Sequence, residues 1–274
     1  QAEYQFKHLL TLRFADKNPV YFYLGQLLQA DQRPAEAMTY YAQVKGGEHY
    51  VPAQLRLAQW LADQGKINEA IERLKAAQTQ ALGQLALSEA QKLQLILAEA
   101  RLLHASQQTR AALALLNQAI KQQPQQGELL YESALLADKL GDITLMEAQL
   151  RRLMSLKPTE AQAYNALAYA FAERNMRLPE ARQLIEKAHA LSPDDPLIWD
   201  SLGWVLYRQG EFSAALTQLE RAYGKNPDPE IAAHLADVLW TLGRQQEAER
   251  ILNQARDKNP NNEVLLETIK RLLP

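Results

Sequence analysis

A helix–turn–helix pattern with a period of about 34 residues constrains this chain more than any other feature, and residues 196–227 show it most clearly. Gly203 and Ala215 remove side-chain bulk where two helices would cross, while Gly210 permits the tight turn between them. Pro227 ends the second helix because proline lacks the N–H that would continue it. A single hairpin cannot bury its own apolar face, so the pattern predicts a stack of such hairpins.

The same pattern recurs on both sides of this segment and predicts an all-α chain. Full hairpins are predicted at residues 18–50, 51–84, 93–126, 127–160, 161–195, 196–228 and 229–262. Residues 1–17 resemble the second half of a further repeat, and residues 263–274 form an amphipathic helix expected to cap the stack. The spacing breaks at a predicted irregular connection, 85–92, after a lengthened helix. We therefore predict two sub-arrays, 1–92 and 93–274.

These residues resemble the tetratricopeptide repeat (TPR) family. The bulky, small, turn and proline positions of the family pattern are held in the clearest repeat by Trp199, Leu202, Gly203, Gly210, Phe212, Ala215, Ala222 and Pro227. The resemblance implies an α-solenoid, a right-handed superhelix of about seven TPR hairpins with a C-terminal capping helix. It also implies a scaffold that binds other proteins or peptides along its concave groove.

Composition and motifs favour neither catalysis nor nucleic-acid binding. The net charge is −2 without runs of Lys or Arg, so the chain lacks the positive surface that phosphate backbones attract. The sequence has no Gly-rich phosphate loop, no cysteine and no membrane-spanning apolar run, and its five histidines are dispersed. His234 and Asp237, on one predicted helix face, are interpreted as a surface hydrogen-bonded pair. We therefore expect no enzyme activity, metal or cofactor.

In the TPR family the first helix of each hairpin lines the groove, so the residues that face it can be identified. They form a row of aromatic and polar side chains: Tyr131, Leu135, Asn165, Tyr169, Asp200, Trp204, Tyr207, Arg208, His234, Asp237 and Trp240. Aromatic side chains among polar groups are typical of protein-binding surfaces. Tyr169 and Trp204 match no core position and are expected to face a ligand, whereas Trp199 is expected to pack. Tyr207 and Trp240 adjoin packing positions and are open to either role.

This row lacks the basic clamp with which TPR co-chaperones grip a C-terminal carboxylate. The clamp uses Lys, Asn and Arg side chains, and the equivalent positions here hold Tyr131, Leu135, Asn165, Tyr169, Asp200 and Trp204. A different mode of ligand binding is therefore expected in the groove.

A closer resemblance covers residues 164–240. The phrases NALAYAFAERN, DSLGWVLYRQGE and PDPEIAAHLADVLW resemble the C-terminal repeats of proteobacterial outer-membrane TPR lipoproteins. That family includes the adaptor of a periplasmic carboxyl-terminal processing protease, which presents cell-wall hydrolases for degradation. The resemblance implies a periplasmic scaffold, anchored to the outer membrane through a lipid on an N-terminal part absent from this sequence. Its implied partners are a processing protease and that protease's substrates.

Other roles fit the same repeats. A pilot lipoprotein would assist a secretin or pilus system, and a targeting arm would serve a larger enzyme. The absence of cysteine fits an oxidising periplasm and also a cytosol. Because residues 1–17 expose Tyr4, Phe6 and Leu9 on a half-repeat, self-association through this segment is a further expectation.

Overall fold

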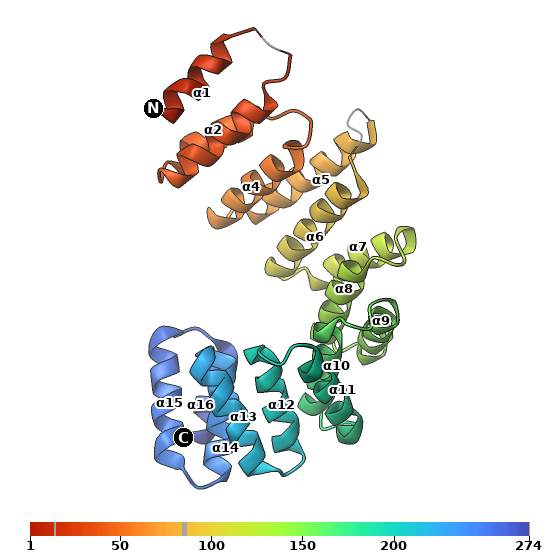
Figure 1. The fold of residues 1–274 in the computed structure, drawn as a ribbon, viewed down its shortest axis with the longest axis vertical. Helices are drawn as coiled ribbons and strands as arrows, with labels where there is room; N and C mark the ends of the chain where they lie inside the picture. The colour runs from red at the N-terminus through yellow and green to blue at the C-terminus, as the bar shows by residue number, and fades with distance from the viewer. Residues whose placement is uncertain (14, 84–86, 274) are drawn as a thin grey trace. The chain divides into compact units, whose positions relative to one another are not determined.

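The computed structural model describes residues 1–13, 15–83 and 87–273, which fold into sixteen helices and no strand (Figure 1). The chain divides into two compact units, Gln1–Gly141 and Asp142–Pro274. Unit 1 contains α1 (Ala2–Thr11), α2 (Asn18–Ala30), α3 (Pro34–Tyr41), α4 (Tyr50–Asp63), α5 (Ile67–Gly83), α6 (Glu89–Ala105), α7 (Thr109–Gln122) and α8 (Gly127–Lys139). Unit 2 contains α9 (Ile143–Leu156), α10 (Ala161–Glu173), α11 (Leu178–Leu191), α12 (Pro196–Arg208), α13 (Phe212–Lys225), α14 (Pro229–Thr241), α15 (Gln245–Lys258) and α16 (Glu263–Leu272).

Consecutive helices pack into the hairpins that the sequence predicts, which confirms the all-α solenoid. In unit 1, α2 packs with α3, α4 with α5, and α6 with α7; in unit 2, α10 packs with α11, α12 with α13, and α14 with α15. The predicted capping helix, α16, contacts both α14 and α15. The sub-array boundary between residues 92 and 93 stays a prediction. None of the described helices has the length and hydropathy needed to cross a membrane.

Local chemistry accounts for the hairpin of α12 and α13. The Asp195 carboxylate accepts a hydrogen bond from the Leu197 N–H at 2.9 Å and caps α12. Gly210 adopts a φ of +85° in the turn, a conformation that disfavours side chains. A Cβ at Gly203 would lie 2.6 Å from the Cγ of Leu219, so only glycine permits this close crossing of the two helices.

The connection between α5 and α6 departs from the regular repeat. Both helices have 17 residues, against 14 in α7, so the lengthened helix predicted here is present. Ser88 and Gln91 form a capping box, with Gln91 N–H donating to Ser88 Oγ at 3.2 Å and Ser88 N–H donating to Gln91 Oε1 at 3.0 Å. α6 therefore begins at Glu89, within the segment 85–92 that we expected to be irregular, while residues 84–86 lie outside the described part.

The first helices of two hairpins in unit 2 are buried on every side. All residues from Ile198 to Leu206 in α12 and from Ile231 to Leu239 in α14 are buried. Trp199 is only 3% exposed, and its Nε1 donates to the Pro193 carbonyl at 2.8 Å, as expected for a packing anchor. The polar side chains of such a helix are buried with it, so each of them needs a hydrogen-bond partner.

Candidate protein-binding site

The predicted groove residues are divided between the two units. Tyr131 and Leu135 lie on α8 in unit 1, where Tyr131 is half-buried and Leu135 is exposed. The other nine lie on three first helices of unit 2: Asn165 and Tyr169 on α10, Asp200, Trp204, Tyr207 and Arg208 on α12, and His234, Asp237 and Trp240 on α14. Unit 2 therefore holds most of the candidate site.

Five of these side chains meet in a compact group, which we call the aromatic cluster: Tyr169, Asp200, Trp204, Tyr207 and His234. His234 Nδ1 lies 2.9 Å and 3.1 Å from the two carboxylate oxygens of Asp200. On its other side, His234 Nε2 lies 3.5 Å from the Tyr169 hydroxyl. The imidazole thus connects α12 with α10 and holds three neighbouring helices in one polar network.

Ring stacking continues the network along α12. The ring of Trp204 stacks on His234 with centroids 4.3 Å apart, and on Tyr207 with centroids 5.0 Å apart. The Tyr207 hydroxyl lies 3.1 Å from Oγ1 of Thr241 on α14. The Arg208 guanidinium lies 5.7 Å from the Trp204 ring centroid. Trp204 is therefore held in one orientation by rings on both sides.

The interpretation of His234 and Asp237 as a surface pair was wrong. Both residues are 5% exposed, and each is paired with a different helix. His234 binds Asp200 on α12, whereas Asp237 accepts hydrogen bonds from Arg271 on α16, with an N–O distance of 2.7 Å. Because successive hairpins stack closely, partners on the neighbouring helix lie nearer than a partner one turn along the same helix.

Trp204, which matches no core position of the repeat, is buried in the structure, and its contact with a ligand stays a prediction. Trp204 and Asp200 are each only 7% exposed, because Tyr169 from α10 and His234 from α14 close over this part of α12. Tyr169, by contrast, is half-buried, as are Asn165, Tyr207, Arg208 and Trp240. The cluster thus has a buried centre. The half-buried side chains around that centre are called its half-open rim below.

Two buried polar atoms at this site have no protein partner. The indole Nε1 of Trp204 and the amide Oδ1 of Asn165 are both buried and make no hydrogen bond with any described residue. One is a donor and the other an acceptor. Native proteins leave few buried polar atoms unsatisfied, so these two make this part of the row a candidate binding site.

The electrostatics of the cluster depend on His234. Burial alone would lower the pKa of His234, but the Asp200 carboxylate, helped by Glu173 and Asp237, raises it above its usual value. The protonated imidazole donates to Asp200 and presents its charge to the Trp204 ring. Within the described ranges, no group of three or more His, Cys, Asp or Glu side chains could hold a metal ion.

Sequence reasoning missed Thr241 and Arg271, which complete the network. A signal for both was present, because Tyr207 and Thr241 are 34 residues apart, and so are Asp237 and Arg271. The same separation joins Asp200 to His234. Equivalent positions in successive hairpins lie side by side, so a search for complementary side chains one period apart would have found all three pairs.

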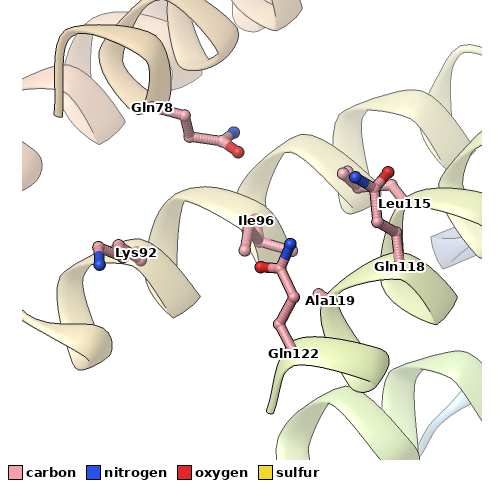
Figure 2. Close-up of a pocket in the computed structure, with 7 residues that line it drawn as sticks. All are labelled: Gln78, Lys92, Ile96, Leu115, Gln118, Ala119 and Gln122. Atoms are coloured by element: carbon pink, nitrogen blue, oxygen red, sulfur yellow. The ribbon is translucent and has the colours of Figure 1, made fainter. Parts of the chain in front are cut away.

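Unit 1 contains a separate cavity of about 250 Å³, lined from α5, α6 and α7 (Figure 2). Gln78 extends toward it from α5, Ile96 lines it from α6, and Gln122 comes from α7. Gln78 also donates to the buried carboxylate of Glu99 at 2.6 Å. Burial raises the pKa of Glu99, against the opposing effect of that hydrogen bond. The lining offers amides, aliphatic groups and the side chain of Lys92, which suit packing and hydrogen bonding.

The fold is an α-solenoid of helical hairpins. The predicted groove residues form a row of polar and aromatic side chains on the first helices of these hairpins. Comparison with known proteins identifies the repeats. A tetratricopeptide repeat family model matches residues 97–145 and 201–263. The chain therefore contains tetratricopeptide repeats, a class of repeat that generally acts as a scaffold for interactions between proteins.

Curated relatives agree with this assignment. The TPR repeat-containing protein PA4667 of Pseudomonas aeruginosa is 41% identical over 252 residues, which cover 92% of this chain and 42% of that protein. The cellulose synthase operon protein C of Pseudomonas fluorescens is 26% identical over 269 residues, which cover 93% of this chain and 21% of that protein. The chain thus spans less than half the length of these relatives.

Solved structures share the fold. A thermophilic TPR protein of Thermus thermophilus matches with a TM-score of 0.59 and 26% identity, over 66% of this chain and 99% of that one. A TPR protein of Parabacteroides merdae matches with a TM-score of 0.74 over 94% of this chain and 99% of that one. The second is only 15% identical, so its likeness concerns the fold alone.

Proposed function

We propose that this array is a non-catalytic scaffold of the periplasm, tethered to the outer membrane, that presents partner proteins to a processing protease. Cell-wall hydrolases are among the proteins it presents. Support comes from the resemblance of residues 164–240 to outer-membrane TPR lipoproteins and from the 41% identity to a Pseudomonas aeruginosa TPR protein. Such a scaffold acts by holding two partners on different surfaces, which raises their effective concentration without altering either active site.

The observation that carries the binding role is the unsatisfied pair formed by Trp204 Nε1 and Asn165 Oδ1. A polypeptide backbone carries one C=O and one N–H per residue, so it offers an acceptor to the indole and a donor to the amide. The Arg208 guanidinium lies over the Trp204 ring, so we expect an arriving segment to displace this side chain.

The aromatic cluster suits this task because it is already ordered. Trp204 is fixed between His234 and Tyr207, so it loses little conformational freedom when a ligand binds. Tyr169 and Asn165 form the half-open rim beside it. Affinity would then come from a few prearranged groups at the centre of the contact, as is typical of protein interfaces.

The test is an affinity capture from periplasmic extract, read by mass spectrometry. The bait is the array with its natural sequence, compared with the double variant Asn165→Leu/Trp204→Phe, which removes the two unsatisfied atoms and keeps an aromatic ring at position 204. Tyr223→Phe on α13 serves as the control, since it changes one half-buried aromatic residue outside the inner row. Circular dichroism checks that all three proteins are folded.

We expect the natural array and the control to retain a processing protease together with cell-wall hydrolases, and the double variant to lose the hydrolases. Equal capture by all three proteins would place binding outside the aromatic cluster. Capture of secretin or pilus components in place of the protease would contradict the adaptor role and favour an assembly role.

A further inference from the structure

A second cavity in unit 1, of about 160 Å³, has an unusual balance of charge. It lies beside the C-terminal end of α3 and is lined by the connection to α4 and by side chains of α4 and α5. Lys45, Tyr50, Gln54 and Arg73 supply its polar lining, and the remainder consists of alanines and a valine. Two positive charges therefore face this cavity, and its lining contains no acidic residue.

Arg73 is the most informative of these side chains. The residue is half-buried, and its Nε is buried without a hydrogen-bond partner among the described residues. Burial lowers the pKa of Arg73, with only a slight opposing effect of Tyr50, because no carboxylate lies near enough to favour the charged form. Such a group costs stability unless something else pairs with it.

Gln54 gives an independent indication. The residue is only 8% exposed, and it lines the cavity. An amide provides both an acceptor oxygen and two donors. Lys45 adds a second cation at the rim, where its Nζ donates to the Ala42 carbonyl at 2.7 Å and keeps further donors available.

We infer that this cavity binds the carboxyl-terminal residue of a partner polypeptide. The terminal carboxylate lies against the Arg73 guanidinium, whose planar fork matches a carboxylate. The amide oxygen of Gln54 accepts a hydrogen bond from the backbone N–H of this terminal residue. Lys45 adds a positive charge at the mouth of the cavity. A small terminal side chain packs against Ala76 and Ala77.

The size of the cavity and the amide favour this occupant. Pockets for drug-sized ligands have volumes of roughly 300–1,000 Å³, so a cavity of about 160 Å³ accommodates one terminal residue with a short side chain. A bare inorganic anion would leave the Gln54 acceptor unused, whereas a chain end brings a carboxylate and an N–H together. The site uses α4 and α5 of unit 1, so it is independent of the aromatic cluster in unit 2.

Fluorescence anisotropy with three labelled peptides tests the assignment. The first peptide ends in two alanines with a free carboxylate, the second is the same peptide with a C-terminal amide, and the third is the amide with glutamate as its penultimate residue. The variants are Arg73→Met, which removes the charge, and Ala76→Leu, which fills the cavity from an exposed helical position. Arg110→Gln removes an equal charge from an exposed site on α7, and Trp204→Phe changes only the aromatic cluster.

We expect the free carboxylate to bind at least about tenfold more tightly than the amide. Arg73→Met and Ala76→Leu should abolish that difference, while Arg110→Gln and Trp204→Phe keep it. The melting temperature of Arg73→Met without peptide should equal or exceed that of the natural sequence, since an unpaired buried charge has been removed.

Equal affinity for the acid and the amide would overturn the inference. So would tight binding of the third peptide, because an internal carboxylate would then be sufficient. A lower melting temperature in Arg73→Met, with peptide discrimination retained in Ala76→Leu, would assign Arg73 a structural role instead. Loss of discrimination in Trp204→Phe would place binding in the other unit.

Discussion

The two units are built from the same hairpin, yet their buried charges differ in how they are paired. In unit 2, Asp200 pairs with His234 and Asp237 pairs with Arg271, so each buried charge has a partner on a neighbouring helix. In unit 1, the buried Nε of Arg73 has no partner among the described residues and Glu99 has only an amide. Regular stacking places complementary positions side by side, whereas the lengthened α5 and α6 interrupt that register. The buried charges described here are therefore paired where the repeats stack regularly, and less completely beside the two lengthened helices.

The largest effect should come from breaking the closest helix crossing in unit 2. Gly203→Leu places a side chain 2.6 Å from Leu219 Cγ and 3.2 Å from the Ala215 carbonyl, so we expect it to destabilise the array by about 3 kcal/mol. Urea denaturation followed by tryptophan fluorescence measures this, since three of the four tryptophans lie in unit 2. Gly224→Ala, with open space around its Cβ, should instead add about 0.5 to 1 kcal/mol. Equal effects of the two changes would contradict the crossing argument.

Breaking the Asp200–His234 pair should cost nearly as much. Removing one partner of a buried pair costs about 3 kcal/mol, so Asp200→Asn should lower the free energy of unfolding by that amount near pH 6. Asp194→Asn removes the same charge from an exposed position and should have little effect.

The pair also predicts a pH dependence. The pKa of His234 is raised in the folded chain, so its contribution is complete below the unfolded value of about 6.5 and is lost as pH rises through the folded value. Denaturation at several pH values above 6 should show this loss in the natural sequence and not in Asp200→Asn. An identical pH dependence in both proteins would exclude His234 as its source.

Glu99 differs from the paired buried charges of unit 2, because removing its charge should stabilise unit 1. Its raised pKa means that the folded chain holds a proton more tightly, so stability falls as pH rises above the unfolded value of about 4.3. Glu99→Gln keeps an acceptor for Gln78 and removes the buried charge, and should add on the order of 1 kcal/mol at pH 7. Glu69→Gln removes the same charge from an exposed position of unit 1 and is a control for net charge. A destabilised Glu99→Gln would show that the charge is paired in solution.

The smallest effect should come from a surface ion pair in unit 2. Arg151 pairs with Glu147 on α9 at 2.8 Å and with Glu180 on α11, and its side chain is 43% exposed. Arg151→Ala should therefore cost less than about 1 kcal/mol, and the cost should shrink at high salt. Thermal melts at two salt concentrations measure this. A loss as large as that of Asp200→Asn would remove the distinction between buried and exposed pairs.

Much of the fold follows from sequence because each hairpin has local signals. Gly203 marks the close crossing, Gly210 the turn and Trp199 the packing anchor, and the structure confirms each of these assignments. The candidate site was predicted less completely. The row of inner positions was identified, but Thr241 and Arg271 were missed, although the repeat period connects them to Tyr207 and Asp237.

The sequence by itself indicated where helices turn and end, and it predicted which positions face the groove. These features depend on spacing and on residue size. Only the tertiary structure decided which of those positions are closed. Trp204 and His234 are buried because α10, α12 and α14 bring their side chains together, and the Nε of Arg73 lacks a partner among the described residues because no carboxylate reaches it. Burial and pairing depend on distances between helices that are far apart along the chain, and local residue patterns do not fix those distances.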